Sequence, residues 1–96
     1  MSDDVRVIDN AAELQYELTV NGNRVGELRY RTEPGELVLV HTEVDPAFEG
    51  RGLGTRLIQG ALDDIRARNL RMTPQCPFVR VFVERHPAYA DLVAEG

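Results

Sequence analysis

Three glycines alternate at the point where the hydrophobic pattern of this 96-residue chain changes. Gly50, Gly52 and Gly54 stand directly before a run whose apolar residues recur with the 3.6-residue period of a helix. Glycine inside a helix costs about 1 kcal/mol relative to alanine. A helix that begins on such residues therefore indicates that bare backbone is needed at its start.

The residues before the glycines alternate between apolar and polar, which is the pattern of half-buried strands. The segment ELQYELTV shows this alternation from Leu14 to Val20, and LVLVHTEV is more continuously apolar. We expect the second segment to be covered on both faces. The turn residues NGN and EPGE separate these runs and predict hairpins. The expected strands are 5–8, 13–20, 24–31 and 37–44.

After the glycines, one helical stripe is expected to end near Asn69, and residues 70–73 predict a short strand. The apolar members of the stripe are Leu53, Leu57, Ile58, Ala61, Leu62 and Ile65. The segment PFVRVFVERHP fits two structures, because its valines alternate as in a strand while Phe78 and Phe82 form a helical pair. This order of elements predicts an α+β or mixed α/β fold.

Size and charge limit the classes of protein. A chain of 96 residues suits one domain, 1–96, with one modest core. The net charge of −5 argues against nucleic-acid binding. The chain has no apolar run long enough to span a membrane and no signal-peptide pattern at MSDDVRV. With Cys76 as the single cysteine, a cytoplasmic location is expected.

The glycine segment predicts a phosphate site. The start of a helix presents unpaired amides and the positive end of the helix dipole, and glycines let a phosphate reach those amides directly. Arg51 and Arg56 add positive charge. The chain has no lysine, which excludes a P-loop, and Thr55 stands at the third glycine position of the dinucleotide fingerprint, which excludes that motif.

The remaining pattern resembles the GNAT superfamily of acyl-CoA-dependent N-acetyltransferases. Its fingerprint, Gln/Arg-x-x-Gly-x-Gly/Ala, corresponds to residues 49–54, with Glu49 where glutamine or arginine is usual. Together with HTEV, TPQCPFV and RHPAY, the resemblance narrows to a very small, YjdJ-type family and covers nearly the whole chain. It implies a compact fold with a largely antiparallel sheet, a V-shaped split between strands, and two main helices, one of them at 78–85.

The resemblance also implies an acetyl-CoA-dependent N-acetyltransferase, acting on an amine that a protein can carry. A non-catalytic module that binds CoA or acyl-CoA is the alternative. In either case coenzyme A is held by one set of residues: Thr42, Val44, Gly50, Arg51, Gly52, Leu53, Gly54 and Thr55. A monomer is favoured.

Three residues are candidates for the chemistry. Acetyl transfer needs a neutral amine and a stabilised leaving thiolate. His41 or Glu43 can take the proton of the amine, directly or through water, and by resemblance Cys76 lies near the acyl end of CoA. Cys76 either accepts the acetyl group or lines the pocket. For Tyr89 we expect core packing rather than protonation of the thiolate, and we expect no metal site.

Overall fold

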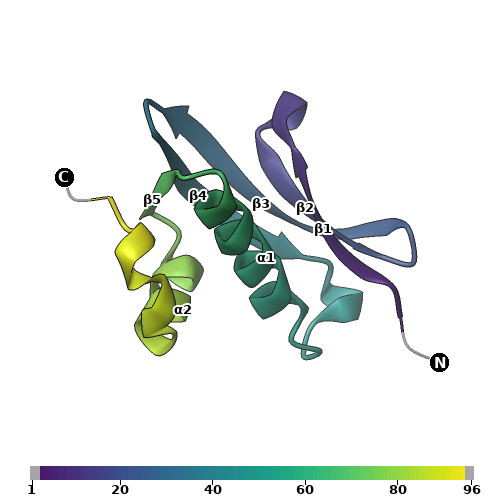
Figure 1. Cartoon of the computed structure of the whole chain (residues 1–96). Helices are drawn as coiled ribbons and strands as arrows, with labels where there is room; N and C mark the ends of the chain where they lie inside the picture. The colour runs from purple at the N-terminus through teal and green to yellow at the C-terminus, as the bar shows by residue number, and fades with distance from the viewer. Residues whose placement is uncertain (1–2, 95–96) are drawn as a thin grey trace.

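The computed structural model describes residues 3–94 as one five-stranded sheet with two helices (Figure 1). The strands are β1 (Val5–Asn10), β2 (Gln15–Val20), β3 (Asn23–Glu33), β4 (Glu36–Val44) and β5 (Arg71–Pro74). The helices are α1 (Leu53–Ala67) and α2 (Pro77–Arg85), with short 3₁₀ turns at Ala11–Glu13, Pro46–Phe48 and Pro87–Leu92. Strands β1 to β4 are antiparallel in sequence order, and β5 pairs in parallel with β4. This arrangement confirms the mixed α+β fold and the helix at 78–85.

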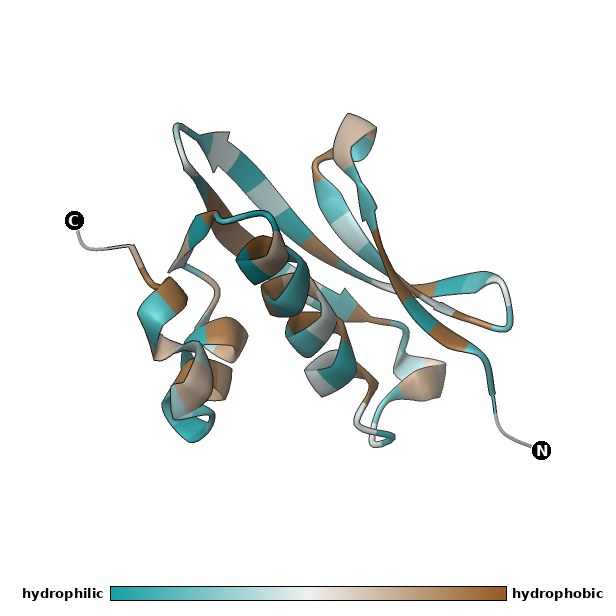
Figure 2. Ribbon diagram, viewed as in Figure 1, coloured by the Kyte–Doolittle hydropathy of each residue, from teal (hydrophilic) through white to brown (hydrophobic). Residues whose placement is uncertain are grey.

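The apolar stripe of α1 packs against the sheet to form the core. All six predicted stripe residues are buried, and they cluster with Leu18 and Leu28 of the central strands. Figure 2 shows apolar and polar residues alternating along these strands. The helix approaches β1 so closely that a Cβ atom at Gly60 would lie 2.7 Å from the side chain of Val7. A glycine is therefore required at this contact, and no larger residue fits without a shift.

Two parts of the strand prediction are wrong. Leu14 does not belong to β2: it has a φ of 54° after the first 3₁₀ turn, and its side chain is 44% exposed. The strand begins at Gln15 because Asn10 caps this turn and ends the preceding strand. In β4, only Leu37 to Leu39 are buried, whereas Val40 is 41% exposed and the residues after it are exposed or half-buried.

A β-bulge and a short neighbour explain the exposed half of β4. Arg29 pairs with His41 and Tyr30 with Leu39, so Val40 is the extra residue of a bulge. On the other side, β5 has four residues and its last pair is Pro74 with Leu39. Beyond this pair β4 continues for five residues without a strand neighbour on this edge in the part of the chain described.

Within residues 3–94, no helix is long and apolar enough to cross a membrane.

Candidate functional site

The site begins where β4 and β5 separate. The Leu39 carbonyl accepts a hydrogen bond from the Cys76 amide at 2.9 Å, and α2 starts at the next residue, Pro77. Proline favours the first position of a helix because an N–H group there would have no partner within the helix. The chain therefore turns away from β4 at this point. The split leaves the main chain of residues 40–44 of β4 facing an opening instead of a partner strand.

The glycine loop borders this opening on the other side. Gly50 and Gly52 have φ values of 78° and 72°, in the left-handed region that favours glycine. Nothing lies within 4 Å of the position that a Cβ atom would take at either residue. Gly52 is also the N-cap of α1, and no side chain caps the helix there. The first amides of α1 are thus bare and accessible, which fits the diphosphate of coenzyme A.

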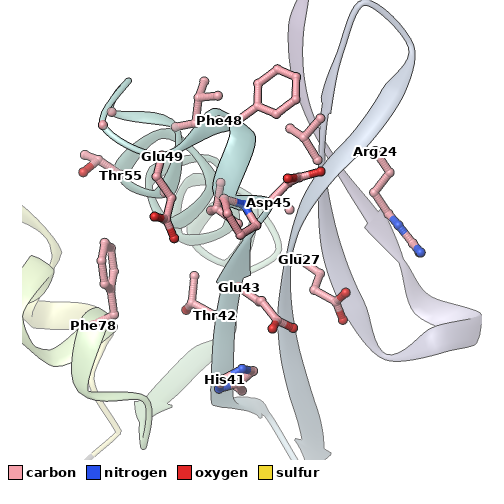
Figure 3. A pocket seen from close by; sticks show the side chains of 18 residues that line it. Arg24, Glu27, His41, Thr42, Glu43, Asp45, Phe48, Glu49, Thr55 and Phe78 are labelled. Atoms are coloured by element: carbon pink, nitrogen blue, oxygen red, sulfur yellow. The ribbon is translucent and has the colours of Figure 1, made fainter.

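A cleft of about 880 Å³ connects the glycine loop to the open edge of β4. We call it the glycine-loop cleft; its lining includes residues of β3, β4, the first turn of α1, and Phe78 of α2 (Figure 3). It brings together most of the predicted site residues: His41, Thr42, Glu43, Val44, Gly50, Gly52, Leu53, Gly54 and Thr55. Two predicted residues, Arg51 and Cys76, do not line it.

Arg51 does not line the cleft itself, and of the two residues it contacts, Asp3 and Phe48, only Phe48 does. Its guanidinium lies 2.8 Å from Asp3 and 5.3 Å from the centre of the Phe48 ring. The cation therefore joins the loop to the start of the chain. Glu49, at the first fingerprint position, does line the cleft and places a carboxylate where the usual residue is neutral or basic.

Cys76 lines a second, adjoining cavity of about 560 Å³, which we call the cysteine cavity. Its sulfur lies 3.3 Å from the Thr42 hydroxyl, across the split. Burial alone raises the pKa of this thiol. The Thr42 hydroxyl and the first amides of α2, at Phe78 and Val79, stabilise the thiolate and bring the pKa below its ordinary value.

His41 and Glu43 lie on the other face of β4. Because the Thr42 side chain points toward Cys76, alternation along the strand directs its two neighbours to the opposite face. Figure 3 shows Glu43 on the side of Glu27 and Thr42 on the side of Phe78. No helix of residues 3–94 covers this outer face beside the split, and both side chains are exposed.

The sequence did not predict two features of the site, the positions of Phe78 and His86, whereas the predicted core packing of Tyr89 is confirmed. Phe78 is 53% exposed and stands between the two cavities, where its ring would lie 3.3 Å from a Cβ atom at Gly54. His86 lines the cysteine cavity from the end of α2. Tyr89 donates a hydrogen bond to Asp63 at 2.6 Å and lines neither cavity. The sequence could not predict that the histidines and the cysteine line one cavity, because their spacing along the chain carries no signal.

Within residues 3–94, no group of three or more histidine, cysteine, aspartate or glutamate side chains is arranged to hold a metal ion.

In this fold a parallel strand pair splits beside a helix start that no side chain caps. Residues 15–92 match the family model described as GCN5-related N-acetyl-transferase. The chain belongs to this family.

Relatives of the chain carry the name Protein NATD1. The protein from Xenopus tropicalis is 28% identical over 88 residues, covering 90% of this chain and 81% of the relative. The protein from Bos taurus is 39% identical over 49 residues, covering 51% of this chain. The bovine match spans less than half of that relative, 43% of its length.

Solved structures share the fold at low sequence identity. A GCN5-like putative N-acetyltransferase from Staphylococcus aureus has a TM-score of 0.71 at 23% identity, covering 100% of this chain and 93% of that one. The ribosomal-protein-S18-alanine N-acetyltransferase from Escherichia coli has a TM-score of 0.64 at 16% identity, covering 88% and 76%. A GNAT family acetyltransferase from Brucella melitensis in complex with acetyl-CoA has a TM-score of 0.56 at 24% identity, covering 75% and 54%.

Proposed function

We propose that this chain is an acetyl-CoA-dependent N-acetyltransferase that transfers the acetyl group to an amine. One observation carries the proposal: the open edge of β4 lies in the same cleft as the bare start of α1. The open edge of β4 offers main-chain hydrogen-bonding groups to an extended chain of amides. The start of α1 offers amide donors to phosphates. Pantetheine and diphosphate are the corresponding parts of coenzyme A. The family and the acetyl-CoA complex of a structural neighbour support the same ligand.

Different residues of the cleft are proposed to bind different parts of coenzyme A. The amides at the start of α1, from Gly52 to Thr55, would hold the diphosphate, and the main chain of Thr42 and Val44 would pair with pantetheine. The acyl end then lies at the split, beside the sulfur of Cys76. Acetyl-CoA supplies the acetyl group as an activated thioester. The chain contributes the position of the thioester and the transfer of protons.

Proton removal from the amine is assigned to the outer face of β4. His41 and Glu43 both line the cleft there, and an amine that approaches the split from this side meets them first. We propose direct transfer, with Cys76 lining the pocket. An acetyl-cysteine at this position is the other version of the reaction. Mass spectrometry after incubation with acetyl-CoA separates them, since an acetyl group that disappears in Cys76→Ala would support the covalent version.

The acceptor is proposed to be a large molecule, such as a protein that presents an amine. No helix of the described chain covers the outer face beside the split, so the described residues leave the acceptor side open. Few residues there would enclose a small amine, whereas a protein acceptor can make contacts over a larger surface. We also propose that the chain belongs to the very small, YjdJ-type group, on the basis of the motifs HTEV, TPQCPFV and RHPAY.

The same openness favours the second candidate, a module that binds CoA or acyl-CoA without catalysis. Calorimetry and thermal melting with CoA and acetyl-CoA test both functions at once, because a ligand that binds only the folded state raises the melting temperature. No binding of either ligand would refute both. Given binding, release of free thiol over a panel of amines and peptides supports the enzyme, and its absence supports the module.

A further inference from the structure

The residues that line the cysteine cavity include both histidines and the cysteine of the sequence, the residue types that ordinarily titrate near neutral pH, although the His41 side chain points to the outer face of β4. The chain has two histidines and one cysteine. His41, Cys76 and His86 all line this one cavity, although they come from β4, the start of α2 and the residue after α2. Groups that exchange protons near neutral pH gather in this way at sites of proton transfer. The proposed function uses His41 and Cys76 and gives no role to His86.

His86 is held in a fixed orientation at the end of α2. Its Nδ1 lies 2.8 Å from the main-chain oxygen of Phe82, and its ring stacks on the Phe82 ring with centroids 4.1 Å apart and planes 17° apart. A carbonyl oxygen only accepts, so Nδ1 must carry the hydrogen. This bond persists whether the imidazole is neutral or protonated. Nε2, which has no hydrogen-bond partner in residues 3–94, is the nitrogen that gains and loses the proton.

The acetyl transfer needs a proton donor for the departing thiolate, and Tyr89 is not placed to be one. Its hydroxyl is bound to Asp63 on α1 and lines neither cavity. His86, by contrast, lines the same cavity as Cys76 and Thr42, beside which the acyl end of the ligand is proposed to lie. His41 and Glu43 project from β4 to the opposite, acceptor face.

Resting on the proposed function, we propose that His86 is the general acid of the acetyl transfer. The amine nitrogen bonds to the acetyl carbon, and its proton leaves to His41, Glu43 or water on the outer face. The carbon–sulfur bond breaks and its electron pair stays on the sulfur of CoA. The proton on Nε2 of His86 then passes to this sulfur. His86 is exposed and regains its proton from solvent.

The titratable and charged groups near His86 come from several elements. Arg85 and Cys76 line the same cavity from α2 and its N-cap, and His41 does so from β4. From α1, Thr55 lines the cavity without a charge. The following 3₁₀ turn contributes Tyr89, which packs on Phe82 and is bound to Asp63.

The test compares His86→Asn with the parent chain. Asparagine keeps a side-chain N–H donor for the Phe82 carbonyl but cannot give up a proton to a thiolate. General acids contribute about 10² to 10⁴-fold to such steps, so we expect kcat to fall at least about 100-fold while acetyl-CoA still binds. In the parent, activity should decline at high pH, because a general acid that has lost its proton cannot donate it. This decline should be absent in His86→Asn and present in His41→Asn.

Two readings on the parent chain do not depend on turnover. Nitrogen-15 NMR of the imidazole should show hydrogen on Nδ1 of His86 at high pH, and CoA should shift the resonance of Nε2. A hydrogen on Nε2 instead, or an Nε2 resonance that CoA leaves unchanged, would overturn the assignment even if no amine is turned over. Turnover by His86→Asn with an unchanged pH profile would also overturn it. Absence of CoA binding to the parent chain would instead refute the proposed function.

Discussion

Substituting Gly52 with alanine separates the two effects of this glycine. At a φ of 72°, an alanine side chain meets the backbone strain of the left-handed region, about 1–2 kcal/mol per residue. For a domain of this size, each 1 kcal/mol lowers the melting temperature by about 4–8 °C. The added methyl group also stands between the first amides of α1 and a phosphate. Losing one charge-assisted hydrogen bond costs about 1.5–3 kcal/mol, so acetyl-CoA should bind at least about tenfold more weakly.

Gly22 supplies the matched control. It has a φ of 84° in the turn between β2 and β3, nothing lies within 4 Å of its Cβ position, and it does not line the cleft. Gly22→Ala should therefore lower the melting temperature about as much as Gly52→Ala and leave the dissociation constant unchanged. Calorimetry with acetyl-CoA on both variants is the assay. Equal affinities for the two variants would show that the glycine loop does not bind the phosphates.

Three further substitutions test packing and proton affinity. Gly60→Ala places a methyl group 2.7 Å from Val7 and should cost about 1–3 kcal/mol in urea unfolding; Val7→Ala should restore part of it, and an unchanged midpoint would contradict the close contact. Burial raises the pKa of Tyr16, so its contribution to stability is complete below about pH 10 and is lost at higher pH; thermal melts of Tyr16→Phe should decline less above pH 10. Thr42→Val should raise the pKa of Cys76, measured by thiolate absorbance at 240 nm, and an unchanged titration would exclude a role for the hydroxyl.

Periodicity predicted most of the fold because burial on one face imposes it. The stripe from Leu53 to Ile65 and the alternation in β2 and β3 each follow from one apolar side facing one core. The bulge at Val40 left no such mark, because the apolar run of residues 37–40 passes through the bulge without a break. The segment of α2 was ambiguous because its valines alternate as in a strand while Phe78 and Phe82 form a helical pair, and only the family resemblance implied a helix.

The glycine loop was predictable as a phosphate site because its chemistry depends on consecutive residues. The cysteine cavity was not, because its members are joined only by the fold. His86 and Cys76 lie at opposite ends of a helix of nine residues, and Thr42 contacts Cys76 across the split. Arg51 shows the opposite case. Its place in the fingerprint predicts a ligand contact, whereas its nearest charge is Asp3, which is far away in the sequence.

Two prolines make the gap beside β4 a permanent property of the covalent chain. Pro74 has no hydrogen to offer a ladder, and Pro77 commits the backbone to a helical turn three residues later. The two prolines thus favour the separated arrangement of β4 and the chain after β5. The free energy of separating the strands is therefore part of folding, and a ligand binds to a preorganised groove.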